Sequence, residues 1–137
     1  MSIDRHQSRI LAMQSLCHHD VQADTLQDAL DALSDEASAG QETVAYARAL
    51  CEQYREDRER IDQAIADASE HWDLTRMDAV DRNVIRIAQV ELLAGEIPTK
   101  VVFNEAIEIG REFGSAESPA FINGLLEAAW KRIAERT

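Results

Sequence analysis

Three glutamates at helical spacing are the residues of this 137-residue chain that come closest to a chemical site. Glu105, Glu108 and Glu112 follow one another at steps of three and four, so on a helix their carboxylates would share one side. Such carboxylates can bind a metal or act as an acid and a base, but both roles need further partners. No histidine or other metal-spaced ligand stands beside them in the sequence. We therefore expect a solvated helix face.

A second polar group consists of the sequence neighbours His18, His19 and Asp20. On a helix, adjacent side chains point about 100° apart, so these three cannot easily share one metal ion. The partial negative charge at the end of a helix favours histidine there. The group therefore predicts a helix C-terminus, not a metal site.

Motifs of the common enzyme classes are missing from the sequence. It has no GxSxG, glycine-rich phosphate loop, HExxH or CxxC. The two cysteines, Cys17 and Cys51, lie far apart and among apolar helical positions, which favours buried thiols over metal ligands. The sequence therefore predicts a protein without catalytic activity, bound metal or cofactor.

Asparagine and glycine interrupt segments that otherwise favour helix, at Asn104 and at Asn123-Gly124. In a helix interior, asparagine costs several tenths of a kcal/mol and glycine about 1 kcal/mol, so some gain must compensate. One explanation is close contact between helices at Gly124, with Asn123 bonded to a neighbouring backbone group. The other is that Phe121, Asn123 and Gly124 form a surface that meets a partner. The spacing favours neither.

The elements that position these residues are clearest in the segment Val80–Ile133, which has the pattern of three helices. Apolar residues recur in it at steps of three and four, as on one buried helix face. Glycine ends helices because it adopts the left-handed conformation at little cost, and proline fits a first helical turn. The expected stop and start residues are Gly95, Pro98, Gly114 and Ser118-Pro119.

The preceding part of the chain predicts further helices. Asp4 would cap a helix that runs to about His19 and carries Arg5 and Arg9 on one exposed strip. A short helix capped by Asp24 or Thr25, one long helix from about Glu42 to Ala68, and a short segment anchored by Trp72, Leu74 and Met77 follow. The chain is thus expected to be all-α, with about seven helices in a single domain over residues 1–137.

The net charge of −12 and the pI near 4.6 disfavour indiscriminate binding to nucleic acid, because the average long-range force on phosphate is repulsive. A local basic site remains compatible with that charge. No signal peptide is visible, and no apolar run approaches the roughly 18 residues of a membrane span. We expect a cytoplasmic protein.

Four segments carry a likeness to a known family. They are IPTKVVFNEAIEIGREFG (Ile97–Gly114), SPAFINGLL (Ser118–Leu126), VDRNVIRIAQVELL (Val80–Leu93) and RILAMQSL (Arg9–Leu16). Through them the chain resembles the NusB family of bacterial transcription antitermination factors. The likeness spans the chain and is weak only across Val21–Arg60. It implies an all-helical fold of two packed helical bundles.

The resemblance also implies a role in the transcription of ribosomal RNA. NusB-like proteins pair with NusE, a small-subunit ribosomal protein, and the pair binds the single-stranded boxA element of nascent RNA. The pair thereby helps the RNA polymerase elongation complex to pass terminators. Some members of the family self-associate through the face that otherwise meets RNA, so a homodimer stays an alternative.

The resemblance further implies which residues meet RNA. In the family, an arginine-rich start of the first helix does so. Arg5 and Arg9 match two of these positions, whereas His6 and Gln7 stand where further arginines are common. Two positions of the last predicted helix match family positions near the RNA surface. The implied RNA-binding residues are Arg5, His6, Arg9, Phe121 and Asn123.

The protein partner is expected to meet Cys17, Asp81 and Arg82. Cys17 stands where the family has a tyrosine on the binding surface, and Asp81 where it has an acidic residue facing NusE. The helix from Asp78 is expected to expose Asp81 and Arg82. Losing the aromatic removes a stacking platform worth ~1–3 kcal/mol per base. A protein-binding paralogue that has lost boxA recognition is therefore the alternative function.

Overall fold

The computed structural model describes residues 3–22, 26–70 and 73–136, and within these ranges it contains seven α-helices, one short 3-10 helix and no strand. The helices are α1 (Arg5–Val21), α2 (Leu26–Glu36), α3 (Gln41–Glu56), α4 (Arg58–Ala68), the 3-10 helix η1 (Leu74–Arg76), α5 (Ala79–Ala94), α6 (Thr99–Phe113) and α7 (Ser118–Arg136). The expected all-α fold is confirmed. The residues Asp24, Thr25 and Trp72, to which we assigned caps and an anchor, lie outside the described ranges.

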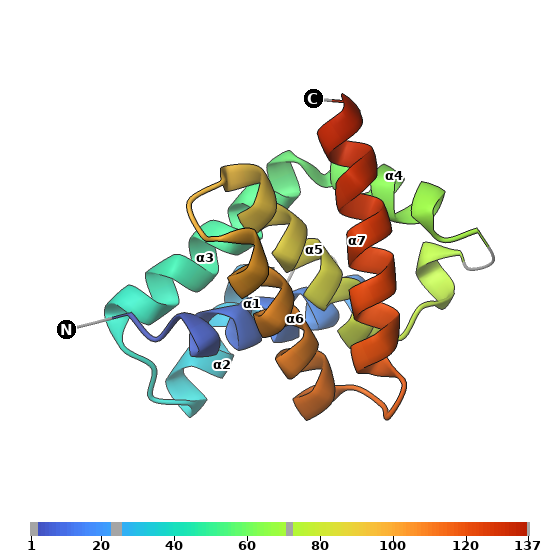
Figure 1. Cartoon of the computed structure of the whole chain (residues 1–137). Helices are drawn as coiled ribbons and strands as arrows, with labels where there is room; N and C mark the ends of the chain where they lie inside the picture. The colour runs from blue at the N-terminus through green and yellow to red at the C-terminus, as the bar shows by residue number, and fades with distance from the viewer. Residues whose placement is uncertain (1–2, 23–25, 71–72, 137) are drawn as a thin grey trace.

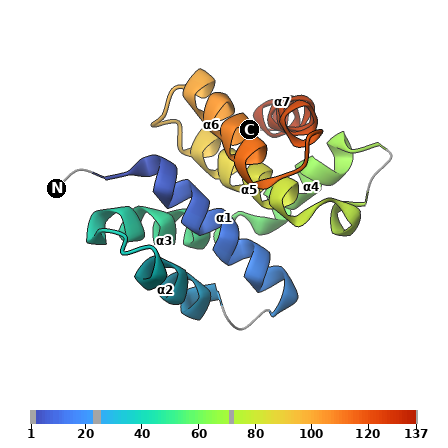
Figure 2. The ribbon, with the colours of Figure 1, turned by 90° about the horizontal axis from the view of Figure 1, so that it is seen from below.

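The helices form two groups that pack against each other (Figures 1 and 2). Helices α1, α2 and α3 make the first group, and α4, α6 and α7 surround α5 in the second. Helix α5 also contacts α1 and α3, so it lies at the junction of both groups. The two packed bundles expected from the sequence are confirmed.

Several helix ends follow the local rules that predicted them. The side chain of Asp4 accepts a hydrogen bond from the backbone N–H of Gln7 at 3.0 Å, and that of Asp78 accepts one from Val80 at 3.1 Å. Such capping satisfies N–H groups that have no partner inside the helix. Gly95 ends α5 with φ 71°, in the left-handed region that favours glycine. These residues fix the start of α1 and both ends of α5.

The prediction of one long helix from Glu42 to Ala68 is wrong. The chain turns at Asp57, which separates α3 from α4, and Arg58 at the start of α4 is exposed. Helix α3 packs on α1, whereas α4 packs on α7 and α5. The turn has no glycine or proline that would mark it in the sequence. The direction of α4 instead follows from its packing on α7 and α5.

Helix α5 is buried all round, as expected of a helix at the centre of a bundle. Every residue from Asn83 to Leu92 is buried, although the segment includes Arg86, Gln89 and Glu91. A buried charge is tolerated only when it is paired and hydrogen-bonded, so these side chains determine where other helices must supply partners. In the described ranges, none of the helices is long and apolar enough to span a membrane.

Candidate functional site

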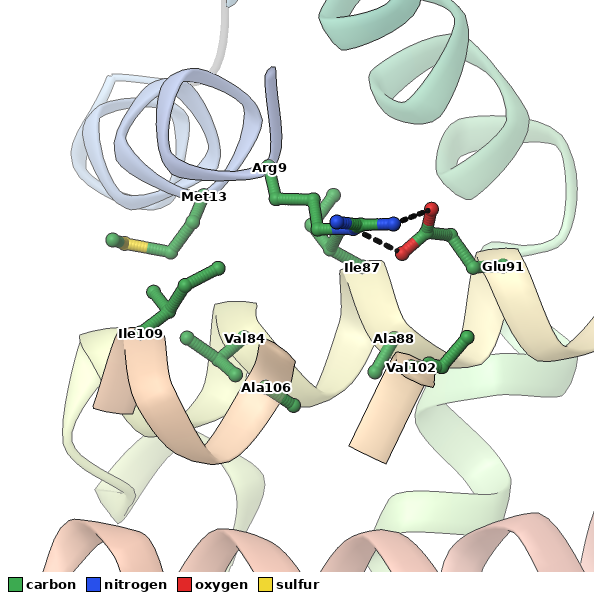
Figure 3. Close-up of a pocket in the computed structure, with 9 residues that line it drawn as sticks. All are labelled: Arg9, Met13, Val84, Ile87, Ala88, Glu91, Val102, Ala106 and Ile109. Carbon is green, nitrogen blue, oxygen red and sulfur yellow. Dashed lines mark hydrogen bonds and ion pairs between the residues drawn. The ribbon is translucent and has the colours of Figure 1, made fainter. Parts of the chain in front are cut away.

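The N-terminal half of α1 contains a buried arginine, Arg9. Its Nε and Nη2 donate to the two carboxylate oxygens of Glu91 in α5 at 2.7 and 3.0 Å (Figure 3). Its Nη1 donates to Oε1 of Glu105 in α6 at 2.7 Å. Arg9 is 5% exposed and Glu91 is 2% exposed. The expectation of an exposed Arg9 is therefore wrong, because α1 turns this side toward α5 and α6. Burial opposes the charge of Arg9, but Glu91 and Glu105 more than offset it and raise the pKa of Arg9.

Tyr46 of α3 extends this cluster toward the surface. Its hydroxyl donates to Oε2 of Glu91, and the guanidinium carbon of Arg5 lies 4.7 Å from the centroid of its ring. Burial, followed by the bond to Glu91, raises the pKa of Tyr46 to about 12, so the phenol stays protonated at neutral pH. Arg5 is exposed, and its position at the start of α1 is the positive end of the helix dipole.

His6 lies between two carboxylates of α6. Its Nδ1 is 3.1 Å from Oε1 of Glu105, and its Nε2 is 3.5 Å from Oε2 of Glu112. Burial alone would lower the pKa of His6, but both carboxylates raise it, so the net shift is upward. The sequence shows no histidine beside these glutamates, but the fold brings His6 to two of them, while Glu108 and Glu112 stay exposed as expected of a solvated face. His6 and Glu105 lie 99 residues apart in the chain, so no local spacing could reveal the contact.

The space beneath the Arg9–Glu91 pair is almost filled. Its apolar wall comes from α1, α5 and α6, and the remaining cavity measures about 10 Å³ (Figure 3). Ligand pockets usually measure about 300–1,000 Å³, so this cavity has room for one water molecule at most. No group of three or more potential metal ligands occurs in the described part of the chain. The cluster therefore leaves no room for a small molecule at this cavity and lies beneath Arg5 and His6 at the surface.

A second polar cluster joins α1, α4 and α5 around Arg86. Its Nε and Nη2 donate to the two carboxylate oxygens of Asp62, both at 3.0 Å, and its Nη1 donates to Asp20 at 3.0 Å. Arg82 adds a bond from Nη2 to Asp20 at 2.8 Å, and its Nη1 reaches the carbonyls of Leu74 and Met77 at 3.1 and 3.0 Å. Arg82 was expected on an exposed edge, but its side chain is largely enclosed against η1.

Asp81 also lies deeper than expected. It is 6% exposed, and its Oδ1 has no hydrogen-bond partner among the described residues. Burial raises the pKa of this carboxyl, a hydrogen bond with Ser118 at the start of α7 lowers it, and the charge of Asp78 raises it further. The net effect is a raised pKa. The expectation that the first turn of α5 exposes Asp81 is wrong because the chain around Ser118 covers it.

Cys51 is buried as expected, whereas the expectation of a buried thiol is wrong for Cys17, which is partly exposed. The Sγ of Cys17 donates to the carbonyl of Ala79 at 3.4 Å and accepts from Nδ2 of Asn83 at the same distance. Cys17 thus lies beside the first turn of α5, close in the fold to Asp81 and Arg82. The three expected partner residues share one region, in which Cys17 and Arg82 are partly exposed and Asp81 is buried.

On α7, Phe121 packs partly against the core, whereas Asn123 and Gly124 are exposed. A Cβ added at Gly124 would meet no atom within 4 Å. The explanation by close helix contact at Gly124 is therefore wrong. The close approach of α6 to α7 instead uses Gly110, where an added Cβ would collide with Ile122.

Comparisons with known proteins give one consistent result. A model of the NusB family matches residues 6–131. The transcription antitermination protein NusB of Trichlorobacter lovleyi is 44% identical over 124 residues, which cover 90% of this chain and 87% of that protein. The protein of the same name from Anaeromyxobacter dehalogenans is 41% identical over 128 residues, covering 93% and 90%.

Solved structures agree in fold. The structure of T. maritima NusB has a TM-score of 0.86 and 34% sequence identity, and the match covers 96% of this chain and 93% of that one. A chain from the crystal structure of antitermination factors NusB and NusE in complex with dsRNA has a TM-score of 0.84 at 22% identity, covering 93% and 96%. At that identity, the second likeness concerns the fold alone.

Proposed function

The chain belongs to the NusB family of transcription antitermination proteins, and from this membership we propose that it binds the boxA element of nascent ribosomal RNA together with NusE. The observation that carries this proposal is the 44% identity to an antitermination NusB over 90% of the chain. The proposed role is non-catalytic and cytoplasmic. The folded chain, residues 1–137 as one domain, reaches the RNA polymerase elongation complex indirectly, through RNA and NusE.

The proposed RNA surface begins at the N-terminus of α1. Arg5 is exposed there, and His6 is partly exposed beside it, so both can reach phosphate. Arg9 acts as the buried support of this turn, because its guanidinium already binds Glu91 and Glu105. Phe121 and Asn123 on α7 make the second part of the surface. The exposed Gly124, which no contact among the described residues explains, supports close approach of a ligand to this face.

The proposed surface for NusE is the region around Cys17 and the first turn of α5. The carboxylate of Asp81 is nearly buried there, and one of its oxygens lacks a partner among the described residues. An unpaired buried acceptor is costly, and a donor from a partner would relieve that cost if the chain around Ser118 moved aside on binding. Arg82 contributes by holding η1 and Asp20 in place. The known complex of a structural relative with NusE and dsRNA supports the choice of partners.

A titration with RNA tests the proposed function. A labelled single-stranded boxA RNA and a scrambled strand of equal composition are titrated with the purified chain, with NusE, and with their equimolar mixture. We expect weak binding by the chain alone and much tighter binding of boxA by the mixture. Equal affinity of the mixture for both strands would overturn the proposal.

The alternative, a paralogue that binds NusE but has lost boxA recognition, draws support from the charge of −12 and from the burial of Arg9. It predicts a stable complex with NusE that shows no preference for boxA. A homodimer formed through the RNA face is a further arrangement. It predicts that added boxA RNA dissociates dimers, which sedimentation measurements would detect.

A further inference from the structure

The contact between Arg5 and Tyr46 joins the proposed RNA surface to the interior. Arg5 belongs to α1 and Tyr46 to α3, and the guanidinium carbon lies 4.7 Å from the ring centroid. Arg5 is exposed and Tyr46 is partly buried, so the ring forms a floor beneath a surface cation. A guanidinium that lies over an aromatic ring can still donate its N–H groups to oxygen atoms around it.

The floor itself is held by buried charges. The hydroxyl of Tyr46 donates to Oε2 of Glu91, and Glu91 is held by two hydrogen bonds from Arg9. Arg9 also donates to Glu105, which in turn contacts His6. A continuous series of contacts thus links both surface cations through groups that have little freedom to move.

We propose that Tyr46 is a positioning residue for RNA binding, which holds the guanidinium of Arg5 in the orientation that meets a phosphate. This inference rests on the proposed function and identifies how its main cation is presented. A free arginine side chain loses rotamer freedom when it binds, and a side chain already held in place loses less. The ring therefore adds affinity without touching RNA.

The effect of Tyr46 differs from that of a charge, and salt dependence separates the two. Each phosphate contact on a single strand contributes about 0.7 to the slope of log affinity against log salt. Arg5→Ala removes charge, so both affinity and slope fall. Tyr46→Leu removes the ring and its bond to Glu91 but no charge, so affinity falls by about 2- to 5-fold, the equivalent of an exposed cation–π contact, while the slope stays unchanged.

The experiment measures boxA binding by the complex with NusE, for the parent and its variants, at several salt concentrations. We expect Tyr46→Leu to weaken binding in the parent but to have no further effect in an Arg5→Ala background, because the two residues act through one contact. Tyr46→Phe, which restores the ring, should recover most of the affinity. The matched control is Tyr54→Leu, because Tyr54 lies on the same helix beneath a buried arginine, Arg86, at 5.0 Å. That control should lower stability and leave boxA affinity unchanged.

Unchanged boxA affinity in Tyr46→Leu, or an equal loss in the Arg5→Ala background, overturns the positioning role while the proposed function stands. Failure of the parent complex to prefer boxA over a scrambled strand overturns both. Should Tyr46→Leu fail to fold, Arg5→Lys provides the second test, since it keeps the charge but loses the planar group. We expect that variant to bind about 2- to 5-fold more weakly with an unchanged slope. Binding equal to that of the parent would overturn the positioning role.

Discussion

Arg9 and Arg86 are two buried arginines, each 5% exposed, that solve the same physical problem in different ways. Each binds both oxygens of one carboxylate and reaches a second carboxylate, and each cluster includes a tyrosine of α3. The first cluster ends at the exposed Arg5 and the partly exposed His6. The second ends in Asp20 and Arg82, which hold α1, η1 and α5 together. The comparison teaches that a buried ion pair can either position side chains at the surface or hold neighbouring helices together.

The clusters also differ in how deeply their acids lie. Glu91 is 2% exposed, whereas the side chain of Asp62 is 18% exposed. Removing one partner of a buried pair leaves an uncompensated charge, and water can relieve that cost only where it has access. The first cluster should therefore be the more sensitive to loss of its acid.

The largest effect is expected for Glu91→Gln. This change leaves Arg9 buried beside a neutral amide and should lower the free energy of unfolding by about 3–5 kcal/mol. Urea denaturation monitored by circular dichroism measures it. The control is Glu108→Gln, the same substitution in an exposed pair with Arg111, which should change stability by less than about 0.5 kcal/mol. Similar midpoints for the two variants would contradict a structural role for the buried pair.

A smaller loss is expected for Asp62→Asn in the second cluster. Arg86 keeps its bonds to Asp20 and Asn83 there, and Asp62 is partly solvated, so we expect about 2–3 kcal/mol. The same denaturation experiment measures it, with Asp31→Asn in the exposed pair with Arg48 as control. A loss as large as that of Glu91→Gln would show that the two clusters do not differ in the way their exposure indicates.

The sequence revealed the fold better than the site because helix ends obey local rules. Asp78 and Gly95 could be identified from neighbouring residues, whereas the turn at Asp57 depends on packing between α4 and α7. Arg9 and Glu91 lie 82 residues apart, so no motif joins them. Two local signals were nevertheless present. Arg9 is in register with the buried Met13, and Glu91 stands inside an apolar segment where a charge needs a partner.

The contributions of the two clusters to stability should also change with pH in opposite directions. The contribution of the second cluster is lost as pH falls. Burial alone would raise the pKa of Asp20, but its bonds from Asn83, Arg82 and Arg86 lower it. A carboxyl with a lowered pKa stabilises the fold above its unfolded pKa of about 3.9, and this contribution is lost as pH falls through the folded pKa. Asp20→Asn should therefore cost about 1 kcal/mol at pH 7, discounted for partial exposure, and less below about pH 4.

Denaturation of the parent and of Asp20→Asn between pH 3 and pH 7 measures this dependence. The informative quantity is the difference in the free energy of unfolding between the two proteins, because acids outside the cluster affect both equally. The exposed Asp35→Asn serves as control and should show no such trend. A difference that stays constant down to pH 3 would indicate that Asp20 does not act through its charge.

The smallest effect, and the opposite one, is expected from His6 in the first cluster. Glu105 and Glu112 raise the pKa of His6 against the effect of burial. A histidine with a raised pKa stabilises the fold fully below its unfolded pKa of about 6.5, and that contribution is lost as pH rises through the folded pKa. Because 43% of the His6 side chain is exposed, solvent screens the pairs and the contribution should be about 0.5 kcal/mol or less.

His6→Gln should thus be less stable than the parent at pH 6 and equal to it at pH 8. The control is the same substitution in a Glu112→Gln background, where the pH dependence should shrink, and an unchanged dependence there would mean that the carboxylates of α6 are not the cause.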